Sequence, residues 1–343
     1  MAKRRYSITL YSPGVAIVRC FLALAALLFA SSQALADVRV LTSIKPLQLI
    51  AAAVQDGLGQ PEVLLPPGAS PHHFALRPSD MRKLQQAELF YWIGPDLEGF
   101  LAKPLASRTA TTLAVQQLDG LQLRHFGEPA RPADHDHDHD HDHDHDHDHD
   151  HDHDQHESAH DEHDDHQHQP GTLDAHLWLL PANAQRIAQR MASDLAALDP
   201  QQAARYQANA DAFAQRLSTL DQHLQARLAP LQGKPFFVFH QAFDYFEQAY
   251  GLQHRGVFNL LGEVQPGARH VALIRQQLQS TGPSCLFSEP PLRPRLLQTL
   301  GEGLPVRMAE LDALGYALAA DAEGYPRLLE NLADNLAGCL EQL

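Results

Sequence analysis

Hydrophobic and polar positions along the first half of the chain predict strands and helices in alternation. Short β-branched or apolar runs at 38–44, 62–65 and 89–93 are typical of buried strands. Helical spacing of apolar residues follows at 47–54, and a helix start opens the stretch at 79–87. Because strands alternate with helices, we expect a parallel sheet with helices on its faces.

The second half repeats this alternation after a long helical stretch. Helix-forming residues dominate 184–198 and 201–231, and apolar residues of the second range recur at helical spacing. Strands are then predicted at 235–239, 256–258, 285–287 and 306–308, and helices at 242–250, 268–280, 292–300 and 325–340. The pattern predicts an α/β fold of two lobes, each with a mainly parallel sheet flanked by helices, joined by one long linker helix.

The expected domain boundaries follow from these elements. We predict an N-terminal lobe over 37–199, the linker helix over 200–231 and a C-terminal lobe over 232–343. The length of 343 residues agrees with this division, because it exceeds what one ordinary hydrophobic core spans.

The first 36 residues have the pattern of a secretory signal peptide. Basic residues at 3–5 precede an apolar run of 11 residues at 20–30, which is too short to cross a bilayer of ~30 Å. Ala34-Leu35-Ala36 then supplies the small residues of a leader-peptidase site. We predict cleavage after Ala36 and a mature protein in the periplasm, not embedded in the membrane; the alternative is an uncleaved anchor helix.

The acidic charge of the chain belongs to one segment. The whole sequence has 42 acidic and 26 basic residues, a formal net charge of -16. Residues 134–168 contain 16 of the acids, 15 histidines and no Lys or Arg, so 26 acids balance 26 bases elsewhere. A nucleic-acid partner requires a basic face, and we therefore expect none.

The acidic segment alternates strictly between His and Asp from 134 to 154 and less regularly after that. Because it contains no apolar face to bury, we predict a disordered loop over 134–168. Imidazoles on such a loop bind several divalent ions weakly. We predict that the loop scavenges metal ions or senses their abundance and hands them to a tighter site; an expanded tract with incidental metal affinity is the alternative. The auxiliary ligands predicted here are His135, His137, His139, His141, His143, His145, His147, His149, His151 and His153.

Two cysteines, Cys285 and Cys339, remain after the predicted leader. An even number in an oxidising compartment is typical of a disulfide, and the two lack metal-ligand spacing. We predict a bond between them, with two buried free thiols as the alternative.

Three histidines outside the tract lie where a ligand could bind. His72 follows a Pro- and Gly-rich turn after the second predicted strand, His176 opens an apolar run, and His240 ends a strand. In open α/β sheets, ligands bind beyond the carboxyl ends of strands. Neutral imidazoles suit zinc, but a lone histidine is more often an ordinary hydrogen-bonded residue.

Motifs along the whole mature chain resemble, in the same order, those of ZnuA-type zinc-binding proteins. They are GASPH at 68–72, LRPSD at 76–80, WIGPDLE at 92–98, DAHLW at 174–178, FVFH at 237–240, EVQPGA at 263–268 and FSEP at 287–290. These proteins are the substrate-binding proteins of zinc-uptake ABC importers, in a family that also binds manganese and iron. The resemblance implies a Zn²⁺ site in the cleft between two lobes.

The resemblance also implies the ligands. His72, His176 and His240 match the three imidazole positions, and Asp312 matches the acidic ligand position near the C-terminus. The fourth position is therefore Asp312 or a water molecule, because many relatives carry a carboxylate where this chain has Pro71. A nitrogen-rich site favours zinc over manganese.

Neighbouring residues have lesser expected roles. We expect the side chain of His73, next to His72 in the sequence, to point away from the metal site. We expect Asp174 and Glu289 to orient ligating imidazoles by accepting a hydrogen bond from the ring N–H that faces away from the metal. Arg77 to Asp80 is expected to cap the following helix.

The implied function is to capture periplasmic Zn²⁺ and deliver it to the membrane permease of an ABC importer, driven by a cytoplasmic ATPase. We expect a monomer. We also expect no catalytic activity, because a zinc hydrolase would require a positioned general base and the chain has no His-Glu-x-x-His motif. The alternatives are a manganese or nickel carrier of the same fold, and a metal-buffering or adhesive surface protein.

Overall fold

The computed structural model describes most of the chain that follows the predicted leader. The described residues are 37–127, 170–259, 267–290 and 295–343. The predicted signal peptide at 1–36 and the predicted loop at 134–168 lie outside them. Contacts divide the chain into Met1–Asp37 and Val38–Leu343, and every element named below belongs to the second unit.

The first sheet consists of four parallel strands in the order β2-β1-β3-β4. They are β1 (Val40–Thr42), β2 (Glu62–Val63), β3 (Leu89–Trp92) and β4 (Thr111–Ala114). The sequence pattern predicted the first three and missed β4. This strand lies at the sheet edge and is only partly buried, so it lacks the apolar run that identified its neighbours.

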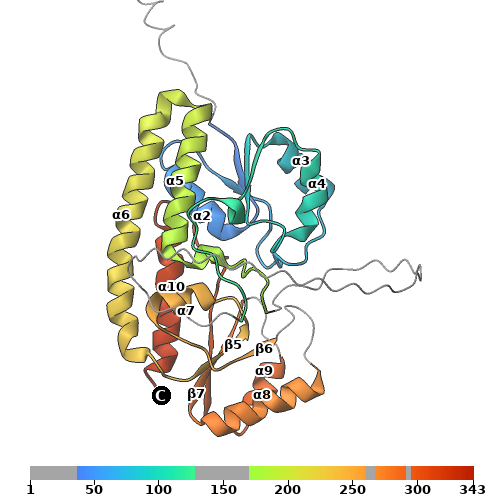
Figure 1. Ribbon diagram of the computed structural model, residues 1–343, viewed down its shortest axis with the longest axis vertical. Coiled ribbons are helices and arrows are strands. Elements are labelled where there is room, and N and C mark those ends of the chain that lie inside the picture. Colours follow the sequence, from blue (N-terminus) through green and yellow to red (C-terminus); the bar gives the residue numbers. More distant parts are fainter. Residues whose placement is uncertain (1–36, 128–169, 260–266, 291–294) are drawn as a thin grey trace, which may run out of the picture. The chain divides into compact units, whose positions relative to one another are not determined.

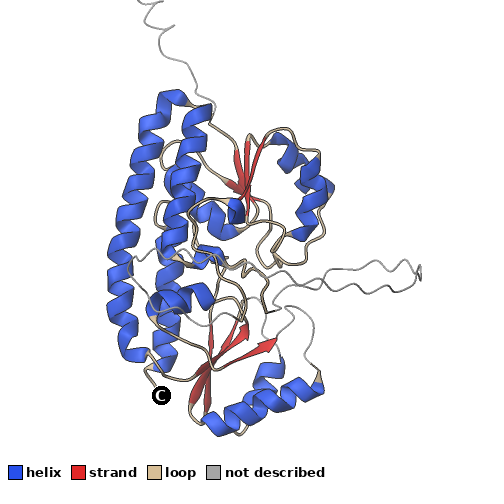
Figure 2. Cartoon of the chain, in the orientation of Figure 1, coloured by secondary structure: helices blue, strands red, loops and turns tan. Residues whose placement is uncertain are grey.

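Helices flank this sheet (Figure 2). They are α2 (Lys45–Val54), α3 (Pro78–Gln86), α4 (Ala102–Ala106) and α5 (Pro181–Leu198). The predicted cap of α3 is confirmed, because the Arg77 backbone N–H donates to Asp80 Oδ2 at 2.8 Å. The sequence pattern did not predict α4, which buries no residue.

The long helix predicted over 201–231 is confirmed as α6 (Ala203–Leu228) with a 3-10 turn at each end, Pro200–Gln202 and Ala229–Leu231. Its 26 residues correspond to roughly 39 Å. It packs along α5 (Figure 1). The buried stripe of α6 consists of Tyr206, Ala210, Phe213, Leu217, Leu220, Leu224 and Leu228.

The second sheet repeats the topology of the first, in the order β6-β5-β7-β8 and again all parallel. Its strands are β5 (Phe236–His240), β6 (Gly256–Asn259), β7 (Ser284–Ser288) and β8 (Val306–Glu310). Its helices are α7 (Asp244–Tyr250), α8 (Ala268–Thr281), α9 (Arg295–Gly301) and α10 (Gly324–Leu340). The prediction of two parallel α/β sheets and a long helix is therefore confirmed.

The C-terminal helix α10 links parts of the fold that are distant in sequence. It contacts α2 and α6 as well as β7 and β8. One contiguous buried cluster contains apolar residues from both sheets, among them Phe90 of β3 and Phe287 of β7. The predicted disulfide between Cys285 and Cys339 is present and fastens β7 to α10.

None of the helices in the described part of the chain has both the length and the apolar character needed to span a membrane.

Candidate metal centre

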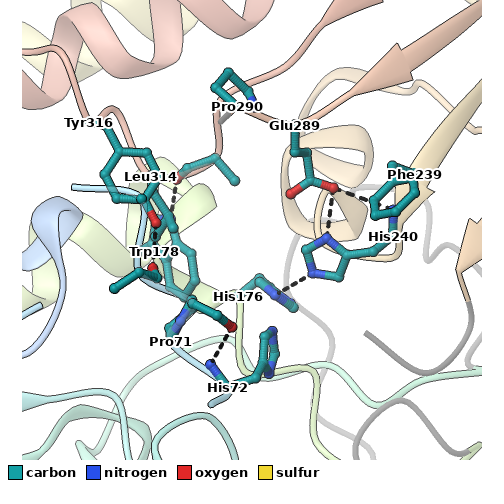
Figure 3. A pocket seen from close by; sticks show the side chains of 14 residues that line it. Pro71, His72, His176, Trp178, Phe239, His240, Glu289, Pro290, Leu314 and Tyr316 are labelled. Carbon is teal, nitrogen blue, oxygen red and sulfur yellow. Dashed lines mark hydrogen bonds and ion pairs between the residues drawn. The ribbon is translucent and has the colours of Figure 1, made fainter. Parts of the chain in front are cut away.

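The three predicted histidines converge in one pocket of about 120 Å³. Each of His72, His176 and His240 offers a ring nitrogen, and these nitrogens lie within 4.8 Å of one another. Figure 3 shows the three rings gathered at one side of the pocket. The pocket lining consists of Gly68, Ala69, Ser70, Pro71, His72, His176, Trp178, Phe239, His240, Glu289, Pro290, Ala313, Leu314 and Tyr316.

Different elements supply the three rings. His72 lies on the loop between β2 and α3, where its backbone N–H donates to Ser70 Oγ at 3.2 Å. His176 precedes the 3-10 turn Leu177–Leu179 and is 2% exposed. His240 is the last residue of β5. Two of the three thus follow or end parallel strands, where binding sites of open α/β sheets form.

The spacing of two imidazoles suits a tetrahedral metal ion. Nε2 of His176 and Nε2 of His240 are 3.2 Å apart (Figure 3). Zn–N bonds of about 2.0–2.1 Å at the tetrahedral angle place two ligand nitrogens about 3.3 Å apart. The ring centroid of His72 lies 5.6 Å from that of His176 and 5.7 Å from that of His240.

Two carboxylates orient the imidazoles, as the sequence predicted for them. Asp174 Oδ1 accepts a hydrogen bond from His176 Nδ1 at 2.8 Å, and Glu289 Oε1 accepts one from His240 Nδ1 at 2.7 Å. An N–H bonded at Nδ1 leaves Nε2 as the lone-pair nitrogen, and in both rings that atom faces the pocket.

Asp174 lies in a buried, anion-rich environment. Burial raises its pKa well above the usual value, and the nearby carboxylate of Asp244 raises it further. The backbone N–H of His176 and the guanidinium of Arg124 act in the opposite direction. A further positive charge near Asp174 would lower this pKa and favour the ionised carboxylate.

Asp312 lies outside the three-histidine group and does not line the pocket. Its Oδ1 accepts hydrogen bonds from the backbone N–H groups of Leu314 at 2.9 Å and Gly315 at 2.7 Å. Its Oδ2 accepts one from the N–H of Tyr316 at 3.0 Å. Burial raises the pKa of Asp312, although these three donors lower it.

The pocket walls are largely apolar and aromatic, and the sequence pattern assigned them no function. Trp178 lies with its ring centroid 5.3 Å from that of His176, and its Nε1 donates to Ala313 O at 2.8 Å. Tyr316 lies on the same side of the pocket as Trp178, whereas Phe239 lies on the other side, beside His240 (Figure 3). Single aromatic residues beside loops carry no sequence signal for this role, because the same residues are common in cores.

A second group of metal-ligand residues, which sequence reasoning missed, lies on and after α7. Ligand-type atoms of Asp244, Glu247 and His254 are within 4.8 Å of one another. His254 Nδ1 is 2.9 Å from both Glu247 carboxylate oxygens. Burial by itself lowers the pKa of His254, but Glu247 and Asp244 outweigh it and raise the pKa. This geometry is that of a buried histidine–carboxylate ion pair. The three-residue spacing of Asp244 and Glu247 along α7 is the feature of the sequence from which the group could have been predicted.

The remaining predicted metal-binding residues lie elsewhere. His73 is exposed and is not part of the three-histidine group. The ten predicted auxiliary histidines, from His135 to His153, lie outside the described residues.

Comparisons with known proteins show the family of this chain. A family model described as "Zinc-uptake complex component A periplasmic" matches residues 40–339. A high-affinity zinc uptake system protein ZnuA from Yersinia pestis is 39% identical over 317 residues, which are 92% of this chain and 95% of the relative. The protein of the same name from Brucella suis is 40% identical over 307 residues, 88% of this chain and 92% of the relative.

Solved structures share the fold at lower identity. A crystal structure of ZnuA has a TM-score of 0.69 and 20% identity, covering 89% of this chain and 100% of its own. The laminin-binding protein Lmb of Streptococcus agalactiae, described as having adhesin and metal transporting activity, has a TM-score of 0.67 and 21% identity, covering 90% and 99%. FpvC of Pseudomonas aeruginosa with Mn²⁺ has a TM-score of 0.67 and 17% identity, covering 90% and 99%. At these identities the likeness shows the fold alone.

Proposed function

This chain belongs to the ZnuA family of periplasmic zinc-uptake components, and we propose that His72, His176 and His240 bind its Zn²⁺ cargo in the cleft between the two sheets. The pocket is lined by loops that follow strands of both sheets. An ion bound there would be held by both halves of the fold at once.

The observation that carries this proposal is the paired orientation of two imidazoles. Asp174 and Glu289 each bond an Nδ1 atom, and the two Nε2 atoms lie 3.2 Å apart. That separation suits two ligands of one tetrahedral zinc ion.

The choice of metal rests on the donor set. Three neutral imidazoles suit zinc, whereas carboxylate and carbonyl oxygens suit manganese. FpvC, whose structure contains Mn²⁺, shares the fold but only 17% identity, so the likeness carries no information on this chain's ion. In competition with equal free concentrations of the two ions, we expect zinc to displace manganese completely.

We propose that a water molecule fills the fourth position. Asp312 has both carboxylate oxygens engaged with backbone N–H groups and does not line the pocket. Recruiting it as a ligand would compete with hydrogen bonds to three partly buried backbone N–H groups, and a buried donor left unpaired costs about 1–3 kcal/mol.

The His-Asp tract has a separate role in this proposal. Its last histidine, His168, is eight residues before His176, so the tract is attached beside the pocket along the chain. Tethered weak ligands raise the local concentration of an ion at the neighbouring site. The tract therefore collects zinc when it is scarce and passes it to the pocket.

The remaining steps follow from family membership and the leader. After export and cleavage behind Ala36, the mature monomer binds zinc in the periplasm and delivers it to an ABC importer permease, which a cytoplasmic ATPase drives. Binding and release are its whole activity, with no catalytic step.

Alanine substitution of each histidine tests the site. In His72→Ala, His176→Ala and His240→Ala, we expect zinc affinity, measured by chelator competition, to fall at least about 100-fold, since even residues that only orient ligands are worth about 10–100-fold. His223→Ala, on the exposed face of α6, is the matched control and should bind as the unchanged protein does. Full affinity in His176→Ala or His240→Ala would contradict the proposal.

The variant lacking 134–168 separates the tract from the pocket in the same assay. It should retain one tight zinc ion per chain and lose the weaker ones. Loss of the tight ion in this variant would mean that the tract, and not the pocket, supplies its ligands.

A further inference from the structure

The loop after β8 contacts the two ligand-bearing segments that precede α5. The Tyr316 hydroxyl donates to the carbonyl oxygen of Ala69 at 2.6 Å. The Trp178 indole N–H donates to the carbonyl oxygen of Ala313 at 2.8 Å. Figure 3 places Tyr316 and Trp178 together on the pocket wall opposite Glu289. One short loop thus holds two segments that lie far apart in sequence.

Each contact is made close to a histidine of the pocket. Ala69 is three residues before His72 on the same loop, and Ser70 between them accepts the His72 backbone N–H. Trp178 is two residues after His176 and its ring packs against the imidazole. Movement of the loop after β8 would therefore be transmitted to both imidazoles.

Asp312 gives this loop its shape. Its carboxylate accepts the backbone N–H groups of the third, fourth and fifth residues of the turn, Leu314, Gly315 and Tyr316. Gly315 has φ of 64°, the left-handed region in which glycine is favoured. The carboxylate therefore fixes the backbone from which the Tyr316 side chain reaches Ala69.

We propose that Tyr316 is a positioning residue for zinc retention, and that Asp312 acts through it rather than as a metal ligand. The hydroxyl of Tyr316 restrains the His72 loop against the loop after β8. A restrained His72 loop keeps the imidazole in its ligating position, so the hydrogen bond slows zinc release. This inference rests on the three-histidine site proposed above.

Release of a spectroscopic probe ion tests the role of Tyr316. The full mature chain is loaded with one equivalent of Co²⁺, whose visible absorption reports its ligands, and release to excess EDTA is followed by stopped flow. In Tyr316→Phe we expect release about fivefold faster, the factor that one net hydrogen bond corresponds to, with an unchanged absorption spectrum.

The control removes a hydroxyl elsewhere. Tyr250 donates to Asp221 Oδ1 at 3.0 Å and does not line the pocket. Tyr250→Phe should release Co²⁺ at the rate of the unchanged protein. Equal rates in Tyr316→Phe and the unchanged protein, or equal acceleration in both variants, would overturn the inference.

A double-mutant cycle assigns the role of Asp312. If Asp312 acts through Tyr316, then Asp312→Ala combined with Tyr316→Phe should release Co²⁺ no faster than Asp312→Ala alone, and the spectrum should stay unchanged. Additive acceleration would show that Asp312 acts independently of Tyr316, and a spectrum altered by Asp312→Ala would identify Asp312 as a ligand. Either result would overturn this part. Asp312→Asn, which keeps one acceptor oxygen, serves if the alanine variant does not fold.

Failure of the underlying site gives a different result. If His176→Ala leaves the Co²⁺ spectrum unchanged, the three-histidine site itself is wrong. If His176→Ala abolishes that spectrum while Tyr316→Phe releases normally, only the positioning role fails.

Discussion

Glu98 is a fully buried carboxyl group that joins the ends of two strands of the first sheet. Its Oε2 accepts the backbone N–H of Gly94, after β3, at 3.0 Å, and its Oε1 accepts the hydroxyl of Ser43, after β1. Burial raises its pKa to about 7, against 4.5 for an ordinary glutamate, even though these hydrogen bonds lower it.

This raised pKa predicts a pH-dependent stability. The unfolded chain ionises Glu98 near pH 4.5, whereas the folded chain keeps the proton up to about pH 7. The free energy of unfolding therefore falls as pH rises between these values and then stays level. From pH 5 to pH 8 we expect this group to lower it by about 2 kcal/mol, and Glu98→Gln to abolish that decrease.

Urea denaturation of both proteins at pH 5 and pH 8 measures the difference. Glu330→Gln, on the exposed face of α10, is the control and should follow the unchanged protein. Parallel loss of stability in Glu98→Gln and the unchanged protein would show that Glu98 does not titrate in this range.

At the scale of elements, α6 was the easiest helix to predict, because its buried residues recur at helical spacing over about six turns. Leu217 is 1% exposed and lies in the middle of that stripe. Leu217→Ala should lower the free energy of unfolding by about 3 kcal/mol, the usual cost of the lost apolar contact and the cavity.

Chemical denaturation measures this cost. The control Gln215→Ala changes an exposed residue of the same helix and should alter the free energy of unfolding by no more than about 0.5 kcal/mol. A small effect of Leu217→Ala would mean that the neighbouring helices close the cavity.

Elements without a strong pattern were harder to predict. β4, with the sequence Thr-Thr-Leu-Ala, is partly buried at the sheet edge, and α4 buries nothing. The periodic spacing of apolar residues reflects a buried face, so an element that buries few residues shows only a weak periodic pattern in the sequence. The ends of α6 were placed within a few residues, since a 3-10 turn and an α-helix share similar spacing.

At the scale of the whole molecule, the disulfide joins residues 54 positions apart and ties the last helix to the second sheet. Because α10 also contacts α2 and α6, the bond restrains a helix that packs on both halves. Replacing both Cys285 and Cys339 by Ala should lower the free energy of unfolding by about 4 kcal/mol through the greater freedom of the unfolded chain.

Denaturation with and without a reducing agent measures this contribution. The reducing agent should destabilise the unchanged protein by a similar amount and leave the double variant unaffected. An equal effect of the reducing agent on both proteins would assign the loss to something other than this bond.

The amino-acid sequence by itself determined the alternation of strands and helices, the long helix, the disulfide pair and the order of the three histidines. Each of these is a local sequence pattern or a matter of composition, and such features can be recognised without knowledge of the tertiary packing. The carboxylates Asp174 and Glu289 were also found from their positions next to the ligands or at a strand end.

Only the tertiary structure decided how these pieces meet. It brought Nε2 of His176 and His240 to 3.2 Å, turned the Asp312 carboxylate onto backbone N–H groups and placed the Tyr316 hydroxyl on Ala69. The physical reason is that residues far apart in sequence approach one another only through the packing of both sheets and their helices. The direction of a side chain within that packing follows no periodic pattern in the sequence, so the sequence alone does not predict it.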